Sequence, residues 1–237
     1  MLSLVGWLDG LTALTVVIFG LIFGLLSFYH SFKLDAKLLG ITGLATTSVG
    51  FTLLGPAVDF LTILITGKNI EPYWLYGLLS YIWVAPILIF GLYLGAELIL
   101  PKKKWIILII YSILSVIFEI LLIYYILTDP SEIFDFPPDP RGESLLNSSL
   151  VRTSPIFIMM VIFLISGLIF NGFGFLNKSM KSSGELRKKF LYLSLGWILF
   201  IVCGALDGVF DPGIAIFFIR IGTILSIVFM YLGVRIT

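Results

Sequence analysis

The sequence predicts an all-α integral membrane protein whose fold is a bundle of seven transmembrane helices. The mean hydropathy is +1.11, and 59% of the residues are hydrophobic while only 12% are charged. Seven apolar stretches, each near the roughly 20 residues that a helix needs to cross a bilayer, fill the chain between short charged loops. A soluble globular protein has no use for so much apolar surface, so we treat the chain as one transmembrane domain over residues 1–237.

The seven spans must be helical, because unpaired backbone groups are too costly in lipid and the continuous apolar runs lack the alternation of a β-barrel. Pro and Gly punctuate the joints, and Pro86 is expected to kink the third span. The first span is too long, and its start too poor in basic residues, for a cleavable signal peptide. We place the spans at residues 8–31, 38–66, 73–99, 105–128, 154–177, 189–209 and 213–234.

The basic residues predict the orientation. Eleven of the 15 Lys and Arg residues fall on one side of the predicted bundle, which the positive-inside rule makes cytoplasmic. The N-terminus is then outside, the C-terminus inside, and the protein a multi-pass protein of the cell membrane. The eleven are Lys33, Lys37, Lys102, Lys103, Lys104, Lys178, Lys181, Arg187, Lys188, Lys189 and Arg235.

One loop is substantial. Residues 129–152 are Pro-rich and acidic and would lie outside the cell. Such a composition is typical of a partly ordered connector, with a lid or a partner-docking segment as the functional alternative. Asn147-Ser148-Ser149 is a glycosylation sequon, although such tripeptides are common by chance.

Ionisable groups inside the spans are costly and call for an explanation. Counted from the outer ends of their spans, Asp59, Glu119 and Arg220 lie at similar depth, roughly 10–14 Å below the surface. We expect Arg220 to form a buried ion pair with one of these two carboxylates. The alternative is an outward-facing polar pocket for an unidentified small ligand. Its candidate ligand-binding residues are Asp59, Glu119, Asp207, Arg220, Trp83 and Trp197.

The chain offers little for catalysis or metal binding. It has one histidine, His30, and one cysteine, Cys203, at opposite ends of the bundle, and it carries none of the common hydrolase or nucleotide-binding motifs. We therefore expect no enzyme activity, no metal site, no cofactor and no nucleic-acid partner. The partners that we expect are the lipid bilayer, the outer ligand and a cytoplasmic signalling protein at the basic inner loops.

Two resemblances concern the third and seventh spans. Residues 80–88 (SYIWVAPIL) resemble the Asp-Trp-x-x-Thr-x-Pro-Leu-Leu stretch of microbial rhodopsins, and Arg220-Ile221-Gly222 resembles their Lys-Val-Gly. The resemblance implies the rhodopsin-like arrangement, but the retinal lysine would fall at Arg220 and the counter-ion at Ser80. Since no lysine lies within a span beyond its first residue, we do not expect a retinal Schiff base.

Residues 76–103 also resemble the seven-helix sensor domains of archaeal and bacterial histidine kinases. These domains show a Tyr-rich start, a central proline and a Phe-x-x-Tyr-x-Gly ending, which here reads Phe90 to Gly95. The resemblance implies a sensor, and the Ile/Leu/Phe/Lys-rich composition is typical of an archaeon. The chain ends soon after the seventh span, so a sensor of this kind would signal through a separate partner.

Three functions remain open. The leading hypothesis is a seven-helix sensor or receptor with an outward-facing pocket. The second is a small-solute or ion transporter of 3+1+3 architecture, because GLIF recurs at residues 20–23 and 167–170. The third is a scaffold whose buried charges only pack helices, with no cavity and a direct Glu119–Arg220 contact. The inner halves of the spans hold few polar groups, chiefly Ser27 and Asn171, which favours a one-sided pocket.

Overall fold

The computed structural model describes residues 2–136 and 142–235, and 81% of the chain is helical. Within the described residues, six helices are long and apolar enough to cross a membrane, or seven if the bent pair α2–α3 is one span. The chain is thus a helical multi-pass membrane protein. The helices are α1 (Leu4–Leu34), α2 (Lys37–Phe51), α3 (Leu54–Thr66), α4 (Trp74–Tyr81), α5 (Val84–Ile99), α6 (Lys104–Thr128), α7 (Pro155–Gly167), α8 (Gly174–Met180), α9 (Gly184–Asp207) and α10 (Ile214–Val234).

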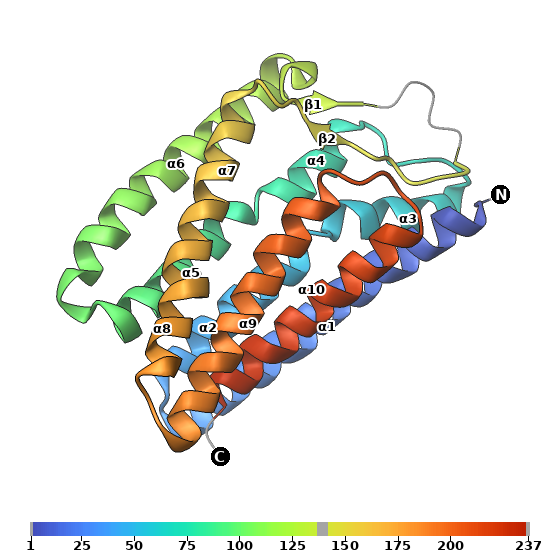
Figure 1. Ribbon diagram of the computed structural model, residues 1–237. Coiled ribbons are helices and arrows are strands. Elements are labelled where there is room, and N and C mark those ends of the chain that lie inside the picture. The colour runs from blue at the N-terminus through green and yellow to red at the C-terminus, as the bar shows by residue number, and fades with distance from the viewer. Residues whose placement is uncertain (1, 137–141, 236–237) are drawn as a thin grey trace.

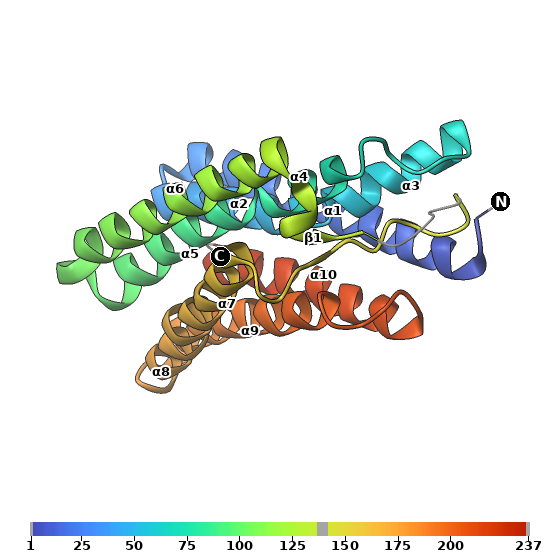
Figure 2. The same cartoon turned by 90° about the horizontal axis from the view of Figure 1, so that it is seen from above.

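The long helices run side by side between two ends of the bundle (Figure 1). We call the end that carries the N-terminus, the long loop and the α9–α10 connection the N-terminal face. The opposite end, with the short connections after α1, α5 and α8 and the end of α10, is the C-terminal face. Seen from above, α7–α10 form one layer and α2–α6 the other, and α1 packs on both α2 and α10 (Figure 2).

Two of the predicted spans are broken, each four residues before a proline. α2 and α3 meet at an angle of 49° around Thr52, and α4 gives way to α5 around Ile82. Pro56 and Pro86 explain the positions, because a proline ring clashes with the carbonyl four residues earlier and provides no N–H to bond it. The third span is thus interrupted where Pro86 predicts a kink.

Helix ends differ from the predicted spans because capping, rather than hydropathy, decides them. α1 begins at Leu4, where the Ser3 side chain accepts a hydrogen bond from the Gly6 N–H at 3.1 Å. α9 begins at Gly184, five residues before the predicted span, and its first two turns carry four charged residues. α7 continues into α8 through a turn of π-helix, η3 (Leu168–Phe173), which the apolar pattern did not predict.

The long loop packs as a cap over the N-terminal face. A 3-10 turn, η2 (Pro130–Glu132), leads into a two-residue strand β1 (Phe134–Asp135), which pairs with β2 (Ser149–Leu150). The side chains of Phe134 and Leu146, both in this loop, are almost completely buried. The described parts of this loop are thus ordered and packed, beyond what its composition predicts; residues 137–141 lie outside the described residues.

Glycines allow α1 and α2 to pack in close contact. A Cβ on Gly20 would meet the Cα of Gly50 at 2.6 Å, and a Cβ on Gly50 would meet the Cα of Gly20 at 2.7 Å. Small residues at such crossings are the usual means by which membrane helices approach.

Gly20→Val is therefore expected to separate α1 from α2 and to lower the apparent free energy of unfolding by about 2 kcal/mol or more. Thermal denaturation of the purified protein in detergent measures this loss of stability. Gly204→Ala is the matched control, because a Cβ there meets nothing within 4 Å. Equal midpoints for the two variants would contradict a tight α1–α2 contact.

A charged pocket as the candidate functional site

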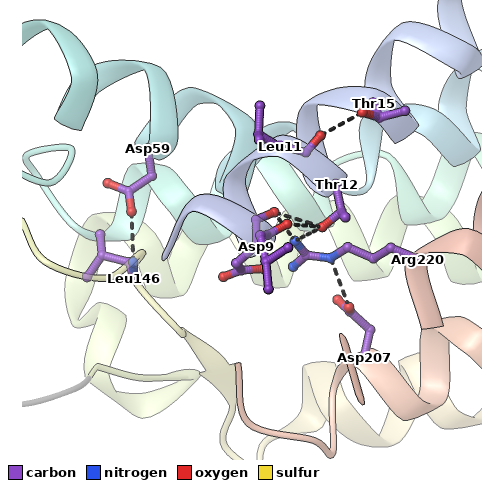
Figure 3. Close-up of polar contacts among 9 residues, drawn as sticks. Asp9, Leu11, Thr12, Thr15, Asp59, Leu146, Asp207 and Arg220 are labelled. Atoms are coloured by element: carbon purple, nitrogen blue, oxygen red, sulfur yellow. Dashed lines mark hydrogen bonds and ion pairs between the residues drawn. The ribbon is translucent and has the colours of Figure 1, made fainter. Parts of the chain in front are cut away.

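Arg220 of α10 is the centre of a buried charged cluster at the N-terminal face (Figure 3). Its Nη1 donates to the backbone oxygen of Asp9, forms an ion pair with the Asp9 carboxylate, and lies 3.3 Å from Thr12 Oγ1. Its Nε donates to Asp207 Oδ1 at 3.3 Å. Arg220 is 4% exposed and Asp9 6% exposed. We call Asp9, Asp207 and Arg220 the charged triad.

The triad joins the first helix to the last two. Asp9 lies near the start of α1, Asp207 ends α9, and Arg220 lies in the second turn of α10. A buried ion pair stabilises only when hydrogen bonds satisfy the remaining charged atoms. Among the hydrogen bonds and ion pairs of the described residues, none uses the Nη2 of Arg220, so this nitrogen keeps two donors for another group.

A cavity of about 330 Å³ opens beside the triad. The loop before α7 and the α9–α10 connection line it at the N-terminal face, where Asn147 Nδ2 donates to Asp211 Oδ1 at 3.4 Å. All three triad residues line it, together with Tyr76 and Ser80 of α4. The volume is within the usual range of small-molecule sites.

Below the triad the walls of the cavity are apolar. They come from α5, α7 and α9, on opposite layers of the bundle. The larger side chains of this section are Ile87, Leu88, Met160, Phe163, Phe200 and Ile201. The cavity therefore changes from charged to apolar along its length.

Two polar side chains line the deep end of the cavity. Asn171 is 1% exposed and Trp197 is 2% exposed, and both flank Gly91 of α5, where a Cβ would collide with them. Asn171 Oδ1 and Trp197 Nε1 have no hydrogen-bond partner among the described residues. Buried polar atoms are nearly always bonded, so this pair needs an explanation.

Local backbone structure places Asn171 at the cavity. It belongs to the π-helical turn η3, a type of distortion that is frequent at functional sites. Ser194 of α9 supports the turn by donating its hydroxyl to the Gly172 carbonyl at 2.8 Å. From the sequence, Asn171 was noted only as one of the few polar residues in the inner halves of the predicted spans.

Three of the six predicted ligand-binding residues line this cavity, and three do not. Asp207, Arg220 and Trp197 line it, whereas Asp59, Glu119 and Trp83 are absent from its walls. The expected pairing of Arg220 with Asp59 or Glu119 is wrong, because its partners are Asp9 and Asp207. The position of a residue along a span does not give the direction in which its side chain points.

Asp59 instead anchors the connecting segments. Its Oδ1 accepts from the Ile70 N–H at 2.7 Å, and its Oδ2 accepts from the Leu146 N–H at 2.7 Å and from Asn69 Nδ2 at 3.0 Å. Asn69 extends this anchor by accepting from the Gly142 N–H. The carboxylate is fully buried, and these three hydrogen bonds all come from the connecting segments.

Glu119 and Trp83 are elsewhere in the bundle. Glu119 lies on α6 and its Oε1 has no partner among the described residues. Trp83 packs edge-on against Phe51, with ring centroids 4.6 Å apart, and its Nε1 is also without a described partner.

The described residues contain no group of three or more His, Cys, Asp or Glu that could hold a metal ion. No protein-family model matches the chain, and no curated protein matches it. The cavity and its charged triad are the features of the described residues that point to a function.

Proposed function

We propose that the protein is a seven-helix membrane sensor that binds a small ligand in the cavity from the outer side and signals through a separate partner. The observation that carries this proposal is the one-sided cavity, which begins at the charged triad and ends at Asn171 and Trp197. In this proposal α2 and α3 form one bent span. The positive-inside rule puts the N-terminal face outside the cell.

The packing beyond the cavity supports a closed inner half. Phe175 of α8 stacks on Phe190 of α9 with centroids 6.2 Å apart, and Leu94 and Leu193 are almost completely buried there. None of these four residues lines the cavity. A transporter needs a polar path to both faces, and a scaffold needs no cavity, so the geometry favours the sensor.

The helices that carry the triad also provide a route for output. α9 and α10 run from Asp207 and Arg220 to the C-terminal face, where α9 starts at Gly184 beside basic residues. A ligand that changes the triad contacts would shift α10 relative to α1 and α9. The partner that reads this shift is expected at residues 181–189 and 102–104, the basic loops of the C-terminal face.

Gly204→Leu tests the binding site without altering the triad. Gly204 lines the cavity, and a Cβ there meets nothing within 4 Å, so leucine is expected to fill the cavity and leave the fold intact. Medium-chain alcohols, amines and carboxylates are screened for a rise in melting temperature in nanodiscs. At 100 times Kd, a bound ligand adds about 2.7 kcal/mol to wild type.

We expect at least one compound to stabilise wild type and Val202→Leu but not Gly204→Leu. Val202 is exposed on the same helix outside the cavity. If no compound stabilises wild type, or if it stabilises Gly204→Leu equally, the cavity is not the binding site.

A second experiment separates a sensor from a transporter. The stabilising compound is added to protein in liposomes, and we expect no flux across the bilayer. Hydrogen exchange at residues 178–189 is expected to change on binding. Flux with unchanged exchange would mean that the protein is a transporter.

The transporter remains the second candidate because of the helix breaks. Thr52 and Leu53, at the break between α2 and α3, and Asn171 in the π-helical turn all line the cavity. Discontinuous helices around a central site are typical of transporters.

A further inference from the structure

The charged triad leaves one donor atom and one acceptor atom unused. Arg220 contacts Asp9 and Thr12 through Nη1 and Asp207 through Nε, and no contact among the described residues uses its Nη2. Asp207 contacts Arg220 through Oδ1, and no such contact uses its Oδ2. Neither atom is among the fully buried polar atoms without a partner, so both keep accessible surface, and both residues line the cavity.

The unused donor and the unused acceptor lie next to each other. Nε and Nη2 belong to one guanidinium, Oδ1 and Oδ2 belong to one carboxylate, and the contact between Arg220 Nε and Asp207 Oδ1 is 3.3 Å long. A single small head group can therefore reach both.

Tyr76 adds a third polar group at the same place. Its side chain is 7% exposed and lines the cavity, and no hydrogen bond of the described residues uses its phenol oxygen. The phenol interacts electrostatically with Asp9, Arg220 and Asp207, so it lies near the triad. A phenol both donates and accepts, and it can therefore bond to a cationic or an anionic part of a head group.

We propose that the cavity binds an α-amino acid with a large apolar side chain, a ligand class that rests on the proposed sensor function. The carboxylate of the ligand accepts from Arg220 Nη2, and its ammonium group donates to Asp207 Oδ2. These two groups leave the same carbon atom of the ligand, which matches the adjacent donor and acceptor of the site. The side chain extends into the apolar section between α5, α7 and α9.

The charged groups around the cavity favour a head group that carries both signs. Among the described residues that line it, three carboxylates (Asp9, Asp207 and Asp211) exceed two guanidiniums (Arg152 and Arg220) by one negative charge. A simple anion would bond to Arg220 but add to this excess. A simple amine would bond to Asp207 but leave the Nη2 donors without an acceptor. A zwitterion provides a partner for both groups.

One face of α9 accounts for the position of the apolar side chain. Phe200, Gly204 and Asp207 are four and three residues apart, so they share a face of the helix, and all three line the cavity. A Cβ on Gly204 would meet nothing within 4 Å, which leaves open space one turn from the carboxylate. Asp207 and Phe200 are separated by roughly 10 Å along the helix, which is within the reach of one large amino acid.

The experiment measures saturable binding of radiolabelled L-leucine, L-methionine, L-phenylalanine and L-tryptophan to the full chain in nanodiscs, with empty nanodiscs as the background. The tightest of the four then competes with L-alanine and with its own decarboxylated and deaminated analogues. We expect each analogue to bind roughly tenfold to a hundredfold more weakly, because it leaves one charged group of the site without its partner. L-alanine should lose a similar factor, because it lacks the large apolar side chain.

Asp207→Asn identifies the contact with the ammonium group. It removes the negative charge while it keeps the size of the side chain, so the amino acid should lose roughly tenfold or more in affinity. The deaminated analogue has no ammonium group and should lose little. Equal losses for the two ligands would mean that Asp207 only maintains the shape of the site, and the assigned contact would be wrong.

Asp135→Asn is the matched control for this variant. Asp135 is an exposed carboxylate of the same face that does not line the cavity. Its removal should leave the affinities of both ligands equal to those of wild type. A loss as large as that of Asp207→Asn would mean that the general negative potential of this face, rather than the triad, holds the amino acid.

Three results would overturn the ligand class, and only the last would also overturn the proposed function. If an analogue with one charged group binds as tightly as the amino acid, the head group is not a zwitterion. If no amino acid binds saturably but an alcohol, amine or carboxylate stabilises the protein through the cavity, the site is real and the assigned class is wrong. If nothing binds, both proposals are wrong.

Discussion

Asp59→Ala is expected to free the long loop from the bundle and to lower the apparent free energy of unfolding by about 3 kcal/mol or more. The alanine leaves the buried N–H groups of Ile70 and Leu146 without an acceptor, and Asn69 loses one of its partners. Hydrogen bonds to a carboxylate are among the stronger ones, and a buried donor without a partner carries the full desolvation cost.

Hydrogen exchange of the Leu146 and Ile70 amides measures this effect directly. A loss of about 3 kcal/mol corresponds to exchange that is roughly a hundredfold faster. Asp59→Asn keeps one acceptor oxygen and should show a smaller acceleration. Unchanged exchange at Leu146 in Asp59→Ala would show that the loop is held by its apolar contacts alone.

Asp129→Ala is the matched control in the same loop. Asp129 Oδ1 accepts from the Ser131 N–H at 3.0 Å and from Ser131 Oγ at 2.6 Å, and these bonds hold the pKa of Asp129 below its ordinary value. The group is exposed, so its removal should leave the unfolding midpoint almost unchanged. The ionised Asp129 carboxylate stabilises the folded protein only slightly. This stabilisation is fully present above the unfolded-state pKa of Asp129 and is lost as the pH falls through its folded-state pKa.

Arg220→Met is expected to lower the apparent free energy of unfolding by about 3–5 kcal/mol. It leaves the Asp9 carboxylate, which is almost fully buried, without its cation, and it separates α10 from α1. Asp207 is 25% exposed at its side chain, so its loss of a partner contributes less. Thermal denaturation with circular dichroism measures the change.

The triad itself provides the control. The triple variant Asp9→Asn, Asp207→Asn, Arg220→Met removes all three charges and should be more stable than Arg220→Met alone. The three residues do not act as one ionic cluster if the triple variant loses as much unfolding free energy, relative to wild type, as the three single variants lose in sum. Arg220→Met would then destabilise through lost packing of the long side chain.

The sequence predicted the helical membrane fold because apolar run length is a local property. Each predicted span corresponds to a helix or a broken helix, and the break before Pro86 follows from one residue's chemistry. The π-helical turn was not predicted, since the apolar pattern gives no sign of it and its Gly172 carbonyl accepts a hydrogen bond from Ser194 on another helix. The number of true crossings depends on whether the bent pair α2–α3 is one span.

The candidate site was predicted in part, for the same reason. Charge inside a span marks Arg220 and Asp207 as residues that need partners, whatever the fold. Asp9 was not among the predicted site residues, and its pairing with Arg220 depends on how α1 lies against α10. Glu119 has similar depth, but it lies on α6, outside the cavity.

The sequence alone determined the class of the protein, the approximate position of its helices and the residues whose burial demands compensation. Those properties follow from the free energy of transferring side chains and backbone from water to lipid. Each segment has its own transfer free energy, which does not depend on its neighbours. Only the tertiary structure decided that Asp59 anchors a loop while Asp9, Asp207 and Arg220 line a cavity with Asn171 and Trp197. The rotation of each helix about its axis makes this decision, and packing against neighbouring helices sets that rotation.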